Sequence, residues 1–169
     1  MILETERLIL HPLTHNQLLK YVKNDNSLNK ELKLKPGEIA ISIELERAIR
    51  ETILPNVIDS DRNYFYNTLW SIISIADEQL IGDLSFIGQP DANGEVEIGY
   101  NIYQEFRNKG YMTEAVSGLI RWAGNQPEIK TITASTETKN VASYTILKKN
   151  NFIKIAEGEG MFIWKLSLK

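Results

Sequence analysis

The sequence contains no cysteine and only two histidines, His11 and His15, among its 169 residues. The missing cysteines exclude disulfides, thiolate metal sites and a cysteine nucleophile supplied by this chain. Because both histidines lie near the N-terminus, we expect neither a histidine-rich metal site nor a Ser-His-Asp triad. Acid–base chemistry would therefore depend on carboxylates, hydroxyls, amines, the backbone or water, and we predict no bound metal.

An excess of charge of one sign is also missing, as is any long apolar run. The formal net charge is -3, which gives no reason to expect a nucleic-acid partner, because such surfaces are usually basic. No apolar stretch approaches the roughly 20 residues that span a bilayer, and the first residues lack a signal-peptide pattern. We expect a cytoplasmic protein without a membrane partner.

The composition that remains is that of an ordinary folded domain. Hydrophobic residues make up 43% of the chain and charged residues 24%. A chain of this length can bury most of its unfolded surface. We predict a single domain over residues 1–169, without internal repeats.

The N-terminal part predicts a strand followed by a helix. The strand covers residues 7–13 and is ended by Pro12. Thr14 is a favourable N-cap for a helix that reaches about Lys23. The predicted apolar side of this helix consists of Leu18, Leu19 and Val22.

A polar segment and a second helix follow. Residues 24–37 are expected to form a loop or a short helical turn. Residues 38–54 show helical spacing of apolar side chains, and Pro55 is expected to stop that helix. We place a substrate-facing cover at residues 38–63. Its acidic residues would suit a cationic acceptor, although helix surfaces carry such charges routinely: Glu44, Glu46, Glu51, Asp59 and Asp61.

The middle of the chain predicts three consecutive strands at residues 68–76, 80–86 and 95–103. Their short connections imply an antiparallel meander. A helix from Met112 to Ala123 then separates the third strand from one at residues 129–136, so these two strands should be parallel. A helix capped by Asn140 and a terminal hairpin at residues 152–156 and 161–168 complete the predicted elements.

The turn between the third strand and the helix combines two cations with a glycine, in Arg107-Asn108-Lys109-Gly110. The first turn of a helix has backbone N–H groups without internal partners and an electropositive end. The turn is therefore a candidate phosphate cradle, although an ordinary strand-to-helix loop with solvated charges has the same pattern.

The segment at residues 138–152 is the second informative one, because Asn140 and Ser143 stand at the start of its helix. Taken alone, these two residues are ordinary helix-capping groups that hydrogen-bond the backbone.

Together these segments resemble the GNAT superfamily of acyl-CoA-dependent N-acyltransferases, and most of all the ribosomal-protein N-terminal acetyltransferases of the Rim type. The matching motifs occur in the family's order along nearly the whole chain. They are the Thr-Glu-Arg-Leu start at residues 5–8, Ile-Gly-Asp-Leu at 81–84, Glu-Ile-Gly-Tyr at 97–100, Arg107-x-x-Gly110 with the helix start after it, and Asn140-x-x-Ser143 with Leu147 and Phe152.

The resemblance implies an α/β (α+β) fold with a mixed, mostly antiparallel sheet of six to seven strands, a central splayed parallel pair and about four flanking helices. It implies acetyl-CoA as cosubstrate and transfer of the acetyl group to a primary amine, either a protein N-terminus or a small molecule. It also suggests a homodimer.

The resemblance further implies the residues of the site. Pantetheine would pair with strand backbone near Ile102, and the pyrophosphate would rest on the turn and the first helical residues. The implied cofactor-binding residues are Ile102, Arg107, Asn108, Lys109, Gly110, Tyr111, Met112, Thr113, Asn140 and Ser143. Ser143 matches the acid of the Rim-type branch. Glu97, expected close to where the strands would splay, is our candidate base, and Glu95 is the reserve.

Three departures and two alternatives accompany this reading. Met112 stands where the family's loop usually has glycine or alanine and is expected to tighten the space beside the pyrophosphate. Asn151 replaces a glycine before Phe152, and Leu147 stands where many relatives carry a tyrosine acid. The alternatives are a domain that senses acyl-CoA without transferring anything, and a nucleotide-binding protein, although the glycine-rich nucleotide motifs are missing.

Overall fold

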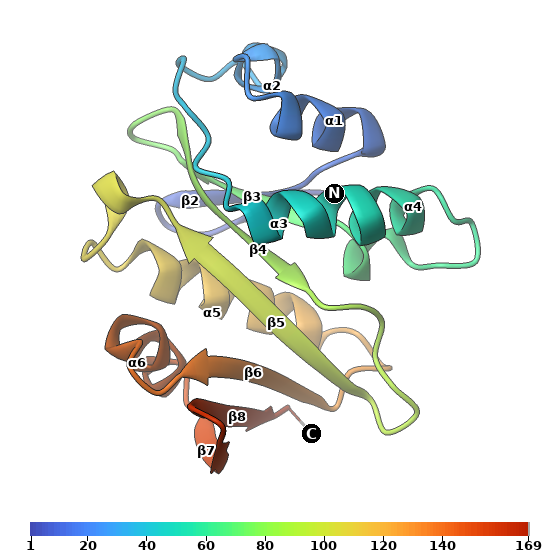
Figure 1. The fold of residues 1–169 in the computed structure, drawn as a ribbon, viewed down its shortest axis with the longest axis vertical. Coiled ribbons are helices and arrows are strands. Elements are labelled where there is room, and N and C mark those ends of the chain that lie inside the picture. Colours follow the sequence, from blue (N-terminus) through green and yellow to red (C-terminus); the bar gives the residue numbers. More distant parts are fainter. Residues whose placement is uncertain (169) are drawn as a thin grey trace.

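The computed structural model describes residues 1–168, in which eight strands form one mixed sheet in the order β1-β2-β3-β4-β5-β6-β8-β7 (Figure 1). The strands are β1 (Leu3–Glu4), β2 (Leu8–Pro12), β3 (Leu69–Ser74), β4 (Gln79–Phe86), β5 (Glu95–Ile102), β6 (Thr131–Glu137), β7 (Ile153–Gly158) and β8 (Met161–Ser167). Only β5 and β6 are parallel. The predicted meander and parallel pair are confirmed, but the count of six to seven strands was too low. The short strand β1 offers no alternation to recognise.

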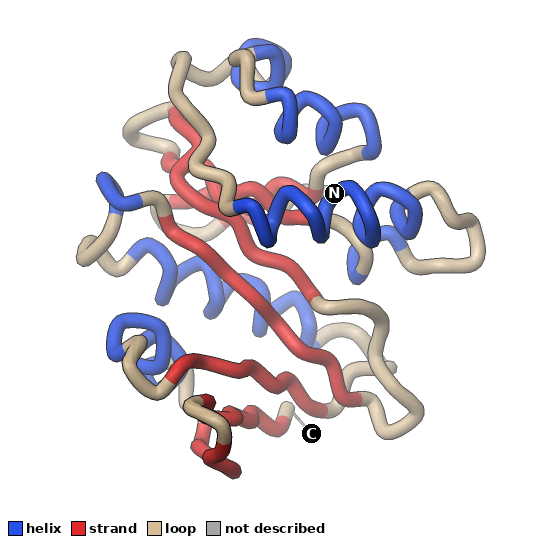
Figure 2. The backbone as a smooth tube through the Cα atoms, viewed as in Figure 1, coloured by secondary structure: helices blue, strands red, loops and turns tan. Residues whose placement is uncertain are grey.

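The helices are α1 (His15–Lys23), α2 (Ser27–Glu31), α3 (Ile43–Ala48), α4 (Leu54–Val57), α5 (Tyr111–Gly124) and α6 (Val141–Lys149). A π-helical segment, Ile49–Ile53, joins α3 and α4, and we call residues 43–57 the cover helix. Figure 2 shows it crossing one face of the sheet while α5 crosses the other. With α1, α2, α5 and α6 it makes five helices among the described residues, besides the 3-10 turns Tyr64–Tyr66 and Gln104–Phe106, against about four expected.

The cover helix corrects both predicted ends of the second helix. It begins at Ile43 and not at residue 38, because Ser42 caps it by accepting a hydrogen bond from the Leu45 N–H. It continues past Pro55, which was wrongly predicted to stop it. A proline ring clashes with the carbonyl of an α-helical turn before it. Here the preceding turn is wider, since the Leu54 N–H donates to the Ile49 carbonyl five residues back.

Helix α1 confirms its predicted cap. The Thr14 hydroxyl accepts from the Gln17 N–H, and the Gln17 side chain in turn accepts from the Thr14 N–H. Its buried face differs from the prediction, because Tyr21 is buried beside Leu18 while Leu19 is 45% exposed. The Tyr21 hydroxyl bonds polar groups of the sheet, so a tyrosine can occupy a buried position for which the prediction had chosen a leucine.

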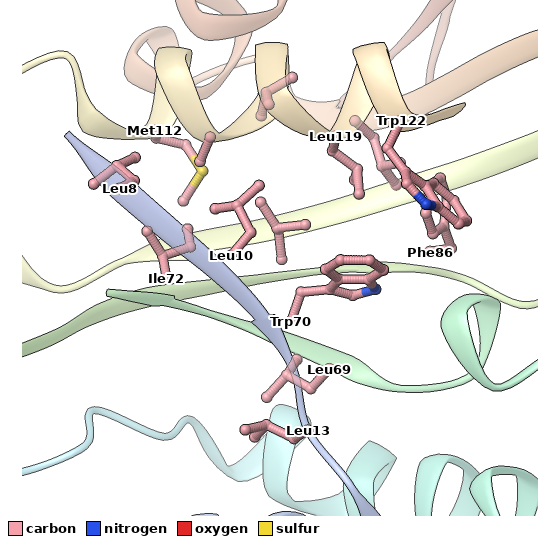
Figure 3. Close-up of a cluster of buried hydrophobic side chains, with 14 of the residues drawn as sticks. Leu8, Leu10, Leu13, Leu69, Trp70, Ile72, Phe86, Met112, Leu119 and Trp122 are labelled. Atoms are coloured by element: carbon pink, nitrogen blue, oxygen red, sulfur yellow. The ribbon is translucent and has the colours of Figure 1, made fainter. Parts of the chain in front are cut away.

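The main core lies between α5 and the sheet. Figure 3 shows Met112, Leu119 and Trp122 of α5 facing side chains of β2 and β3. The Trp122 ring has its centroid 5.6 Å from that of Trp70 and 5.5 Å from that of Phe86. Aromatic pairs at such distances add to the stabilisation from burial. This packing fixes α5, and therefore its N-terminal end, against the strands. No helix within residues 1–168 is long and apolar enough to cross a membrane.

Gly82 of β4 allows close approach of β5 and generates a stability prediction. A Cβ atom there would lie 2.4 Å from the backbone oxygen of Asn101. We expect Gly82→Ala to lower the free energy of unfolding in urea by about 1–3 kcal/mol, because backbone on both strands must shift.

Gly99→Ala is the matched control on the neighbouring strand, since its Cβ would meet only the Ile87 Cδ1 at 3.7 Å. We expect its free energy of unfolding to change by less than about 0.5 kcal/mol. Equal losses in the two variants would contradict the close-approach explanation.

Candidate functional site

The site begins where β5 and β6 part. The two strands pair only through Glu95–Thr131, Val96–Ile132 and Glu97–Thr133. Beyond these positions β5 continues along β4, and β6 continues along β8. Figure 1 shows the two strands diverging toward the end at which α5 begins. The predicted splay therefore starts immediately after Glu97.

The second half of β5 directs backbone polar groups into this opening. The Glu97 carbonyl and the Tyr103 N–H both bond to the β4 side. Because strand backbone alternates, the polar groups of Tyr100 and Ile102 point to the other side, which β6 has left. The Ile102 carbonyl there accepts from the Arg107 Nε at 3.3 Å. Ile102 thus lies where a pantetheine contact would need it, and the contact itself stays a prediction.

The turn after β5 has an unusual backbone. Asn108 and Gly110 have φ angles of 60° and 77°, in the left-handed region. Gly110 is the N-cap of α5 and supplies no side chain to bond the first N–H groups, those of Tyr111, Met112 and Thr113. Alternation of left- and right-handed residues lets successive N–H groups converge on one point, which suits an anion.

Arg7 holds this turn in place, although we predicted no role for it. The Arg7 Nη1 donates to the Lys109 carbonyl at 2.9 Å, and its Nε pairs with the Glu114 carboxylate at 2.6 Å. The Thr5 hydroxyl and the Arg7 N–H donate to the same carboxylate. We call these residues, Thr5, Arg7 and Glu114, the clamp.

The clamp also sets the charge state of Glu114. Partial burial raises the pKa of this carboxyl, but hydrogen bonds from Thr5 and Arg7 outweigh burial, so the net pKa is lowered. Arg7 additionally lies over the Tyr111 ring, 4.6 Å from its centroid. The Thr-Glu-Arg-Leu motif was the available signal, but no local pattern shows that it meets residues more than 100 positions away.

Met112 requires a correction. Its side chain is 3% exposed and packs beside Leu8 in the core under α5 (Figure 3). It therefore points away from the turn, and the expected tightening beside the pyrophosphate is wrong. Only the backbone N–H of Met112 belongs to the first turn of the helix.

The two cations of the turn are exposed. Arg107 bonds the Ile102 carbonyl, and the Lys109 Nζ lies 5.3 Å from the centroid of the Phe106 ring. Both side chains are long enough to reorient toward an anion on the turn.

The two candidate bases differ in their partners. Glu95 forms an ion pair with Lys165 at 2.9 Å. Glu97 accepts a hydrogen bond from the Ser135 hydroxyl at 3.0 Å and occupies the last paired position before the opening. The geometry favours Glu97 over Glu95, and its role stays a prediction.

Ser143 and Tyr100 form a pair across the opening. The Asn140 Oδ1 accepts from the Ser143 N–H, the predicted capping bond. The Ser143 hydroxyl donates to the Tyr100 hydroxyl at 3.2 Å, and Tyr100 donates to the Ser143 carbonyl at 3.0 Å. Burial raises the pKa of Tyr100 to about 12, so it stays protonated at neutral pH. Tyr100 was in the recognised strand motif but received no role.

A cavity of about 540 Å³ lies between the cover helix and strands β4 and β5. Its lining includes Tyr100, Ile102 and Arg107 from the predicted cofactor side, Asp83 from β4, and Ile41 and Leu45 from the cover. Glu97, Asn140 and Ser143 are outside this lining. The first part of the predicted cover thus lines a cavity, and its contact with a substrate stays a prediction.

The acidic residues of the cover have a smaller part than expected. None of the five lines the cavity. Glu46 pairs with Arg50 and Asp59 with Arg62 on the surface. Within residues 1–168 no group of three histidines, aspartates or glutamates is arranged to hold a metal ion.

Comparison with known proteins gives consistent matches. The family model of the Acetyltransferase (GNAT) domain matches residues 7–153. The N-acetyltransferase YjdG of Bacillus subtilis (strain 168), described as uncharacterized, is 31% identical over 156 residues, which are 90% of each chain.

Two solved structures share the fold at low sequence identity. RimL, a ribosomal L7/L12 alpha-N-protein acetyltransferase in complex with coenzyme A, has a TM-score of 0.67 at 18% identity and covers 99% of this chain and 98% of its own. A ribosomal-protein-S5-alanine acetyltransferase from Vibrio fischeri has a TM-score of 0.71 at 16% identity and covers 99% and 96%.

The clamp predicts a measurable stability difference. We expect Arg7→Met to lower the free energy of unfolding by about 1 kcal/mol, because it removes the guanidinium bonds to the Glu114 carboxylate and to the Lys109 carbonyl, while the Thr5 hydroxyl and the residue-7 N–H still donate to Glu114. Arg50→Met, which removes the exposed pair with Glu46, is the control and should cost less than about 0.5 kcal/mol. Urea unfolding of both variants checks this, and equal losses would argue against the clamp.

Proposed function

The chain belongs to the GNAT acetyltransferase family, and we propose that it transfers an acetyl group from acetyl-CoA to a primary amine by direct attack in a ternary complex. The amine is either a protein N-terminus or a small molecule. The observation that carries this proposal is the opening between β5 and β6, which ends at the left-handed turn and the uncapped start of α5. A homodimer stays a prediction.

The residues of the opening fit acetyl-CoA, which supplies an activated acetyl group as a thioester. In our proposal the backbone at Ile102 pairs with pantetheine in the manner of an added strand. The N–H groups from Asn108 to Thr113 hold the pyrophosphate, helped by Arg107 and Lys109. Charge-assisted hydrogen bonds of this kind contribute about 1.5–3 kcal/mol each, so a few suffice for micromolar affinity. The capping bond engages the Asn140 Oδ1, which leaves its amide nitrogen for a cofactor contact.

The amine must lose a proton before it attacks. At neutral pH this costs about 1 kcal/mol for an α-amine and roughly 4–5 kcal/mol for a lysine-like amine. Glu97 serves as the base through a water molecule, because it lies at the point where the strands part. The Ser143 hydroxyl has one hydrogen, which it donates to Tyr100 in the free protein, and in our proposal it turns this hydrogen to the sulfur of the leaving thiolate. A positioned acid of this kind contributes about 10²- to 10⁴-fold in rate.

Ligand binding tests the cofactor half of the proposal. We expect acetyl-CoA at about 100 times its dissociation constant to stabilise the protein by about 2.7 kcal/mol, and to raise the melting temperature by roughly 5–10 °C. ATP and NAD at the same concentrations are the controls and should give little shift. Stabilisation by ATP alone would overturn the proposal.

Thiol release with a panel of amines tests the transfer. We expect Ser143→Ala to lower turnover about 10²-fold, near the lower limit for acid catalysis, because a thiolate is already a fair leaving group. Glu97→Gln should lower turnover at neutral pH and recover partly at high pH, where the amine is already unprotonated.

The controls are Ser60→Ala and Glu159→Gln, which change exposed residues outside the site. Wild-type turnover in both site variants would show that the assigned roles are wrong. Binding of acetyl-CoA without thiol release from any amine would favour the sensor alternative.

A further inference from the structure

A buried carboxylate lines the cavity beside the proposed cofactor residues. Asp83 of β4 is 3% exposed and lies on the cavity wall with Ser85 and Asn101. The Tyr21 hydroxyl of α1 donates to its Oδ2 at 2.9 Å, and the Asn101 side chain also bonds the carboxyl. Our proposed mechanism gives Asp83 no task.

Asp83 has no cationic partner within residues 1–168, where every ion pair joins other residues. The titratable groups nearest to it are Tyr21 of α1, Tyr103 after β5 and Arg107 of the turn, while His11 lies two strands away, in register through Ser71. Arg107 is held at the Ile102 carbonyl, and His11 bonds Gln17.

Keeping such a buried carboxylate ionised costs free energy. Burial raises the pKa of Asp83 to about 7, and the hydrogen bonds from Tyr21 and Asn101 only partly oppose this. Next to it in register, the buried Ser71 hydroxyl has no hydrogen-bond partner among the described residues. A cationic ligand in the cavity would stabilise the charged carboxylate.

The position of Asp83 separates it from the proposed base. Asp83 pairs in register with Asn101, which lies four residues beyond Glu97 and, by strand alternation, on the same face. Four residues of strand span about 13 Å between Cα atoms. A reacting amine served by Glu97 therefore cannot also rest on Asp83, so any cation at Asp83 is another part of the acceptor.

We propose that Asp83 binds a second cationic group of the acceptor, carried at the far end of an apolar chain from the reacting amine. The acceptor class is then the α,ω-diamines and longer polyamines. Ile41, Leu45 and Leu69 supply apolar lining for the methylene chain, and Asp83 supplies the anion at its end. This inference rests on the proposed acetyl transfer and names the acceptor of that site.

The test compares 1,6-diaminohexane with 1-aminohexane, which has the same chain and one cation. With wild-type protein and saturating acetyl-CoA, we expect the KM of the diamine to be at least tenfold lower. Asp83→Asn should abolish this preference while leaving the KM for acetyl-CoA and the kcat/KM for 1-aminohexane unchanged. A loss of activity with both amines would instead indicate a structural role and would overturn the proposal.

Two further measurements separate recognition from folding. Asp83→Asn keeps the shape of the side chain, and Tyr21→Phe removes a hydrogen bond from Asp83 while keeping the carboxylate. Tyr21→Phe should retain the preference for the diamine. Diamine binding to the wild type, measured by calorimetry without acetyl-CoA, should weaken by up to about tenfold per pH unit below pH 7, because protonation removes the anion. Asp83→Asn should lack this dependence.

The outcomes distinguish this inference from the proposed function. If no amine releases thiol but diamine binding still depends on Asp83, the transfer proposal fails and the dication site is supported. If thiol is released equally from both amines and Asp83→Asn changes neither, the dication site is overturned and the transfer proposal stands.

Discussion

The parting of β5 from β6 is the constraint on which the rest of the structure depends. A sheet that opens between two strands normally exposes unpaired backbone on both, and such edges are costly or prone to association. Here each strand keeps a full antiparallel partner on its outer side, β4 for β5 and β8 for β6. The sheet therefore stays continuous through three paired positions while its middle opens.

Two sets of contacts keep the open end in register with the turn. The core under α5, including Met112 and Trp122, fixes the helix on the sheet. The clamp fixes the turn from the other side by holding the Lys109 carbonyl and Glu114. The turn can then keep left-handed residues at Asn108 and Gly110 without being rigid by itself. The core under α5 on one side and the clamp on the other hold the turn in this conformation.

Much of the fold followed from local patterns, because the elements around the site are locally consistent. Alternation at residues 95–103 located β5, and the caps at Thr14 and Asn140 located α1 and α6. The errors have local causes too. A two-residue strand has no period, and a π-helical turn lets a helix run through Pro55.

The site was harder to predict, because its contacts join distant positions. Arg7 meets Glu114, and Tyr100 meets Ser143, through packing that no window of sequence contains. In the sequence, Asp83 looks like an ordinary polar strand residue. It is a buried carboxylate only because α1 and the cover helix pack over it. The side-chain direction of Met112 was likewise decided by which face of α5 meets the sheet.

Through the clamp, the first residues of the chain contact Lys109 and Glu114, which are distant in the sequence. Thr5 and Arg7 follow β1, which is tied to the sheet by only two paired positions. Short edge pairings of this kind open at low free energy compared with a core. Thr5 stands next to β1, whereas Arg7 is tied to the sheet by its carbonyl, which accepts from the Ile75 N–H. The turn before α5 therefore takes part of its support from the residues that join β1 to β2, about a hundred positions earlier in the sequence.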